Sequence, residues 1–173
     1  MKKIVLTLIA SLLCFFASAQ ISIQEARALW KEWDEVHATY ARDYARFKSE
    51  KKLNFRLLSE PKRTYVLRLT NFIITTERID ADNLIFGQAS EYLSKQADSW
   101  RDKINQLEKD EPDELIFSSE EKELIALWSN LVRAGTRLDE LLDLLYSEDK
   151  KWLVSQKSRF VEGYYYKDDM LCL

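Results

Sequence analysis

The residues that could do chemistry in this chain are few, and the first is His37, the only histidine in 173 residues. Asp34 lies three positions before it, a spacing that carboxylate-bridged metal sites in helical bundles use. Such sites also need several glutamates and usually a second histidine from facing helices. The sequence therefore predicts no metal site, and we expect His37 to lie within or beside an apolar seam.

A second kind of chemistry, nucleophilic catalysis, requires a base beside the nucleophile. Cys172 is the only cysteine beyond residue 14, and a pair with His37 would have to join a chain end to the first helix. The sequence contains no CxxC or HExxH motif and no glycine-rich phosphate loop. We therefore predict a protein that is not an enzyme and that uses no cofactor.

Charged residues separate into a basic stretch and an acidic stretch. Residues 42–68 contain nine basic residues against three acids, and residues 108–123 contain eight acids against two lysines. The basic stretch suits an anionic lipid or glycan surface, and its candidate binding residues are Lys51, Lys52, Arg56, Lys62 and Arg63. The plainer interpretation is that both stretches are solvated. The net charge of −3 argues against nucleic-acid binding.

Residues 1–19 have the features of a secretory signal peptide that is removed from the mature protein. Two lysines precede an apolar run over residues 4–16, and a small-residue cleavage site follows at residues 17–19. The run is shorter than the roughly 20 residues that cross a bilayer. Cys14 follows Leu13 instead of a small residue, which argues against lipid attachment. We predict export to the periplasm or the extracellular space without a lipid anchor.

Apolar residues recur every seven positions in three segments, and this spacing predicts three long helices over residues 22–57, 61–109 and 119–162. The first segment repeats with Ala26, Trp33, Tyr40 and Phe47. The second repeats with Tyr65, Phe72, Ile79, Phe86, Leu93, Trp100 and Leu107. The third repeats with Leu124, Leu131, Leu138, Leu145 and Trp152. Each helix is therefore expected to bury one stripe against the others.

Capping signals mark where these helices begin. Ser22 with Glu25, and Ser118 with Glu121, match the capping-box spacing, in which each side chain reaches the other residue's backbone N–H. Pro61 stands in the first turn of the second segment, where proline is well tolerated. These signals predict short joints before residues 61 and 119.

Two acidic clusters, at residues 80–82 and 147–149, are the alternative turn positions. The seven-residue register runs through both, and neither contains glycine or proline, so we expect kinks at most. Residues 64–76 are rich in β-forming side chains, which makes a strand there a further alternative. The proline start and the seven-residue spacing favour a helix.

These boundaries predict an all-α fold, an elongated antiparallel three-helix bundle with coiled-coil-like packing over residues 20–163. Its basic and acidic joints would lie at opposite ends, which suits end-on contact or head-to-tail self-association. A turn at Asp80–Asp82 or at Ser147 would give a four- or five-helix up-down bundle instead. A turn at Asp80–Asp82 would put both joints at one end, where they could neutralise each other.

A notch at Ala134-Gly135 interrupts the third helix, because glycine in a helix interior costs about 1 kcal/mol relative to alanine. The expected reason is room for a large neighbour, such as Trp33, Tyr40 or Trp100.

Residues 164–173 form an aromatic and apolar tail beyond Gly163, which fits a helix C-cap. The tail would fold back on the bundle or dock on a partner protein, and its candidate contact residues are Tyr164, Tyr165, Tyr166 and Cys172. Cys172 would stay a free thiol or form a disulfide between chains.

Two functions fit these features. The first is an exported, non-enzymatic helical interaction or structural module of a bacterial envelope or cell-surface assembly, with protein partners. By expected architecture alone, it resembles accessory subunits of secretion and conjugation systems. The alternative is a periplasmic helical bundle that holds a small apolar ligand near the Ala134-Gly135 notch.

Overall fold

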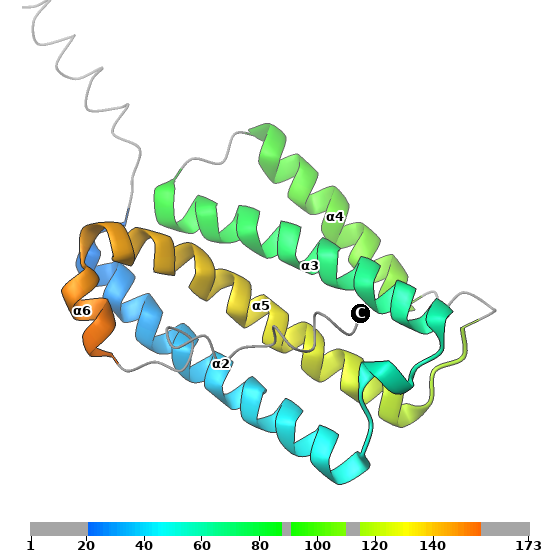
Figure 1. Cartoon of the computed structure of the whole chain (residues 1–173). Helices are drawn as coiled ribbons and strands as arrows, with labels where there is room; N and C mark the ends of the chain where they lie inside the picture. The colour runs from blue at the N-terminus through cyan, green and yellow to red at the C-terminus, as the bar shows by residue number, and fades with distance from the viewer. Residues whose placement is uncertain (1–20, 88–90, 110–114, 157–173) are drawn as a thin grey trace, which may run out of the picture.

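A computed structural model describes residues 21–87, 91–109 and 115–156, and the described chain is helical with no strand (Figure 1). Its elements are α2 (Ile23–Lys51), the 3-10 turn η1 (Phe55–Leu57), α3 (Glu60–Phe86), α4 (Glu91–Lys109), α5 (Ser119–Glu148) and α6 (Lys150–Ser155). The predicted all-α class is confirmed. Residues 64–76 lie inside α3, so the strand alternative is wrong there.

The four long helices reverse direction from one to the next along the chain, and α5 packs between α2 and α3, while α4 packs on α3 (Figure 1). Neighbours in space are therefore not all antiparallel. The contacts Lys62–Glu121, Thr70–Trp128 and Arg78–Glu140 join α3 to α5 at separations of 59, 58 and 62 residues. A nearly constant separation means that α3 and α5 run parallel.

The expected single helix over residues 61–109 is wrong, because it is two helices that end and begin around Gly87. Gly87 caps α3 in the left-handed conformation, with φ 61° and ψ 21°, and its N–H donates to the Asn83 carbonyl. Glycine adopts this conformation without a Cβ clash, so it is a common helix stop. The helix does run unbroken through Asp80–Asp82, as expected. The four- or five-helix alternative is therefore closer, because the described residues form five helices, although the first turn follows Phe86 and not Asp80–Asp82.

The seven-residue register that suggested one helix has another cause. Phe72 on α3 and Trp100 on α4 lie 28 residues apart, which would be about 42 Å along a continuous helix. Their ring centroids are instead 5.1 Å apart, edge to face, across the α3–α4 contact. Phe72 and Trp100 therefore share a position in the seven-residue repeat and are in contact because α4 runs back along α3. A different stripe of α3, which includes Val66, Leu69 and Ile73, is buried in the core cluster that contains Trp128 of α5.

The third predicted helix is also shorter than expected. α5 ends at Glu148, and Asp149 has φ −150° and ψ 45°, after which α6 turns back against α5. Arg27 of α2 donates to the Asp149 carboxylate through Nε at 2.6 Å and lies over the Trp152 ring. The acidic cluster at residues 147–149 therefore ends a helix instead of kinking it.

The core consists of two apolar clusters, and α5 contributes to both. One is built around Trp128 with Tyr44 and Phe55, and the other around Leu138, Leu141 and Leu145 with Trp30. The predicted stripe Leu124, Leu131, Leu138 and Leu145 is buried, which confirms it. Both predicted capping boxes are also present. Each fully buried large apolar side chain contributes about 1.5–3 kcal/mol, so this seam stabilises the fold.

Candidate functional site

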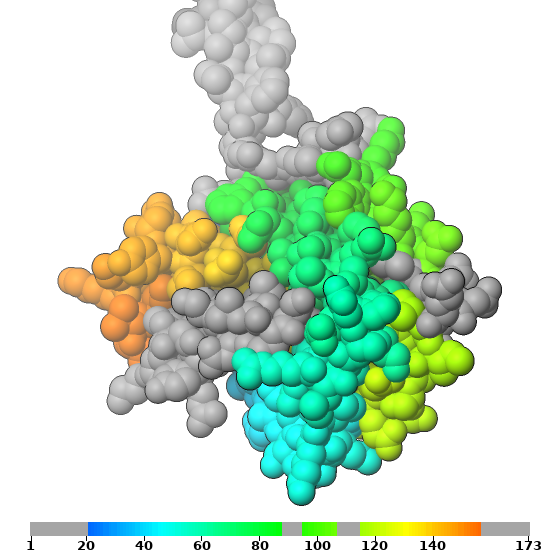
Figure 2. Space-filling view, turned by 45° about the vertical axis from the view of Figure 1, so that its right-hand side comes forward, coloured from blue at the N-terminus to red at the C-terminus, as the bar shows by residue number. Residues whose placement is uncertain are grey.

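The predicted basic residues do not form an isolated basic end. Because α3 and α5 run parallel, the joint before α3 and the joint before α5 lie at the same end of the molecule. Figure 2 shows the end of α2, η1 and the start of α5 together there. Lys62 Nζ donates to Glu121 Oε2 at 2.6 Å, with both side chains mostly buried. The basic and acidic stretches therefore meet, and the expectation of opposite charged ends is wrong.

The remaining candidate residues of the basic stretch have mixed surroundings. Arg63 donates through Nη1 to the Leu58 carbonyl at 2.7 Å, which closes the turn before α3. Lys51 and Lys52 are exposed at the end of α2, and Arg56 is exposed in η1. Tyr164, Tyr165, Tyr166 and Cys172 lie outside the described residues.

His37 is buried in α2 with 3% of its surface exposed, so it lies within the apolar seam and not at its rim. Burial lowers the pKa of its imidazole, and the nearby carboxylate of Asp34 opposes that shift. The described residues contain no group of three or more metal-ligating side chains that could hold an ion.

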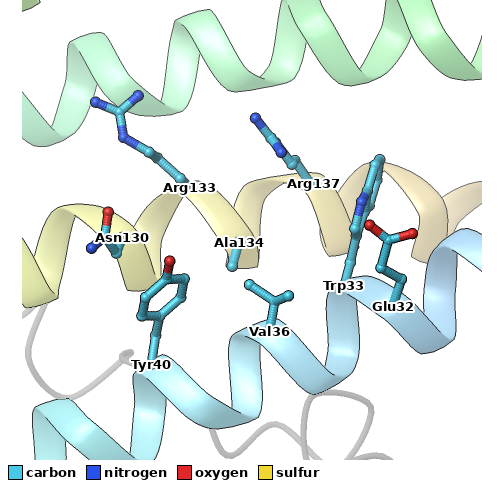
Figure 3. A pocket seen from close by; sticks show the side chains of 8 residues that line it. All are labelled: Glu32, Trp33, Val36, Tyr40, Asn130, Arg133, Ala134 and Arg137. Atoms are coloured by element: carbon cyan, nitrogen blue, oxygen red, sulfur yellow. The ribbon is translucent and has the colours of Figure 1, made fainter.

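A surface cleft lies between α2 and α5 (Figure 3). Its volume is about 190 Å³, and four side chains from each helix line it. Those from α2 are Glu32, Trp33, Val36 and Tyr40, and those from α5 are Asn130, Arg133, Ala134 and Arg137. Part of this lining was predicted from the sequence, because Trp33 and Tyr40 were expected beside the notch at Ala134. The third expected neighbour, Trp100, lies on α4 instead.

The floor of the cleft is apolar. Ala134 leaves space that a larger side chain would fill, and Val36 faces that space with 41% of its surface exposed (Figure 3). Trp33 and Tyr40 stand seven residues apart, so they are about 10 Å apart along α2 and flank the floor. A cavity of about 150 Å³ can hold benzene, so this cleft has room for one ring-sized group.

The upper wall of the cleft is cationic, and a buried carboxylate of α3 holds it in place. Arg133 Nη1 donates to Glu77 Oε1 at 3.0 Å, and Arg137 Nε donates to Glu77 Oε2 at 2.6 Å. The Glu77 side chain is 5% exposed, whereas those of Arg133 and Arg137 are 32% and 43% exposed. Arg137 also lies 5.9 Å from the centre of the Trp33 ring. One carboxylate therefore orients two guanidinium groups at the edge of the cleft.

These three charged residues were not predicted from the sequence, although one signal was available. Arg133 and Arg137 are spaced by four on one helix, and like charges at this spacing repel each other slightly. A pair of this kind in a mostly buried helix indicates a shared acidic partner. Glu77 could be assigned as that partner only from the parallel packing of α3 and α5.

A comparison of the chain with protein-family models, with curated proteins and with solved structures finds no match. None of the described helices is long and apolar enough to cross a membrane.

Proposed function

We propose that this protein is an exported, non-enzymatic helical protein that binds a small ligand with an apolar ring-sized part in the cleft between α2 and α5. The observation that carries this proposal is the open apolar floor of Val36 and Ala134 between the Trp33 and Tyr40 side chains. Small-molecule sites combine such apolar surface with a few placed polar groups, and the paired arginines supply those here.

Export is supported by residues 1–19, with their basic start, apolar run and small-residue cleavage site. The expected product is a mature chain that begins at Gln20. N-terminal sequencing of the protein recovered outside the bacterial cytoplasm checks this. A recovered chain that still begins at Met1 would contradict the signal-peptide assignment.

Binding is tested by titrating the protein with benzyl alcohol, a neutral single-ring compound, while following the tryptophan indole N–H signals by NMR. The Trp33 signal is expected to shift and saturate, whereas that of Trp128, buried in the other core cluster, stays unchanged. Val36→Phe fills the cleft from an exposed helix position, so it should abolish the shift without unfolding the protein. Equal shifts in the wild type and in Val36→Phe would count against the cleft.

A second candidate function is the interaction module of an envelope assembly, such as a secretion or conjugation accessory subunit. Charge separation between the ends no longer supports it. It is supported instead by two exposed apolar side chains in the joints at one end, Leu57 at 64% and Ile116 at 80%. Sedimentation would then show self-association that the double substitution Leu57→Asp, Ile116→Asp removes. Concentration-independent sedimentation of the wild type would contradict self-association through this end.

A further inference from the structure

We infer that the ligand of the α2–α5 cleft is a carboxylate, namely a small acid whose single aromatic ring or branched alkyl group occupies the apolar floor. This inference rests on the proposed function and names the chemistry of its ligand. It depends on the side of the cleft nearest α3, where Arg133 and Arg137 line the cleft and their side chains extend toward α3 (Figure 3).

The two guanidinium groups are held before any ligand arrives. Each bonds a different oxygen of Glu77, whose carboxylate is almost fully buried on α3. A charged side chain oriented by a buried partner loses less rotamer entropy on binding than a mobile surface arginine. Arg137 uses Nε toward Glu77, and its planar fork carries four further N–H donors on the two Nη atoms. That geometry suits a carboxylate.

The Arg137 guanidinium at this wall also favours an anion. Its side chain is 43% exposed, so it carries a positive charge at the cleft edge. Glu32 lies on the α2 side and offsets part of that charge, but its side chain is exposed and therefore well screened. Removing its charge should consequently strengthen the binding of an acid and leave the binding of a neutral compound unchanged.

The aromatic side chains determine where the apolar part lies. Trp33 is 9% exposed and packs beside the Arg137 guanidinium, so its indole is fixed at one side of the cleft. A ring between Trp33 and Tyr40 lies over Ala134 and Val36, with its substituent directed toward the arginines. Binding of the ring and of the carboxylate should therefore be separable in an experiment.

The test compares phenylacetate with phenylacetamide, which has the same ring and nearly the same shape but no charge. Dissociation constants come from the Trp33 indole signal of the full mature chain. Because hydrogen bonds to charged groups are the stronger ones, phenylacetate is expected to bind at least about tenfold more tightly. Its addition should also move the Nε–Hε signals of Arg133 and Arg137.

The structure offers a matched internal control in Arg78. Its Nε donates to Glu140 at 2.7 Å across the same pair of helices, but it does not line the cleft. The Arg78 Nε–Hε signal should stay in place with both compounds. Arg137→Lys should weaken phenylacetate binding by about tenfold with no change for phenylacetamide, and Arg78→Lys should change neither. Glu32→Gln should tighten phenylacetate binding by about twofold.

The outcomes separate the two proposals. Equal affinities for phenylacetate and phenylacetamide would overturn the carboxylate inference and leave ring binding in the cleft intact. No binding of either compound, with benzyl alcohol also inactive, would overturn the proposed function together with the inference. The arginine signals of the unaltered protein give the result even if Arg137→Lys does not fold.

Discussion

Two glutamates at the interface between α3 and α5 both accept hydrogen bonds from arginines, but the charges around them differ in sign. Glu77 projects from α3 and accepts from two arginines of α5, and its side chain is 5% exposed. Glu140 projects from α5 and accepts from Arg78 of α3 at 2.7 Å, and its side chain is 15% exposed. The first carboxylate has a surplus of positive partners, whereas the second has acids around it.

That difference appears in the pKa values at the acidic site. Burial raises the pKa of Glu140, and nearby Asp82 raises it further, while Arg78 opposes the shift. Burial and the charge of Asp143 likewise raise the pKa of Asp139. Within a few turns of α5, positive charge is therefore concentrated beside the cleft and negative charge is concentrated beyond it. The two cationic partners of Glu77 are thus also residues that line the cleft.

The removal of both arginine partners of Glu77 is expected to have the largest effect on stability. Arg133→Met with Arg137→Met keeps the apolar stems and leaves a buried carboxylate without cationic partners. Breaking a buried pair costs about 3–5 kcal/mol, and since both guanidinium groups are partly solvated we expect about 2–3 kcal/mol here. Urea denaturation of the two proteins measures the difference in the free energy of unfolding.

Adding Glu77→Gln to that double variant should recover most of the lost stability, because it removes the uncompensated charge. The design distinguishes a charge effect from lost packing, since the methionines remain in both proteins. If the double variant unfolds at the same urea concentration as the wild type, Glu77 does not depend on its arginines.

A matched pair of single substitutions gives the next largest effect. Arg137→Met and Arg78→Met each remove one Nε–carboxylate bond, of 2.6 Å and 2.7 Å, across the same two helices. Arg137→Met should cost about 1–2 kcal/mol because Glu77 is buried, and Arg78→Met less than about 1 kcal/mol because Arg78 is 54% exposed. Thermal unfolding measures both. Equal losses would show that the burial of the carboxylate does not matter.

Much of the fold could be predicted from the sequence, because the leucine stripe of α5 and the capping boxes at Ser22 and Ser118 are local signals. The reversal after Phe86 was not predicted, because the single helix over residues 61–109 was inferred from the phase of the seven-residue repeat. A loop of suitable length preserves the phase of a seven-residue repeat, so Phe72 and Trp100 stay in step although the chain turns between them. Gly87 was the available stop signal.

The candidate site was predicted only in its apolar half. Ala134 with Trp33 and Tyr40 could be inferred from side-chain volume, because a small residue in a helix makes room for a large one. The charged half could not be predicted without knowing how α3 and α5 are arranged. An antiparallel pairing of the second and third segments would place Glu77 opposite the end of α5, far from Arg133 and Arg137. Only the parallel arrangement of α3 and α5 brings these residues together.

Asp139, next to Glu140 on α5, is expected to have the least influence on stability. Because the pKa of Asp139 is raised in the folded state, its charge destabilises the protein at neutral pH. This cost disappears as the pH falls through the raised folded pKa, and it is absent below the ordinary value of 3.8. Asp139→Asn should therefore be more stable than the wild type at pH 7, by less than about 1 kcal/mol, and equal to it at low pH.

Stability curves of the wild type and Asp139→Asn between pH 7 and pH 3.5 check this, and the difference between them is the quantity to follow. His37 bends both curves in the other direction, because burial lowers its pKa and stability falls as the pH drops below its ordinary value of 6.5. That contribution is common to both proteins and cancels in the difference. If the stability difference between the two proteins stays constant with pH, the effect comes from packing of the asparagine. The negative charge of Asp139 would then not destabilise the protein, and the electrostatic contrast with Glu77 would be wrong.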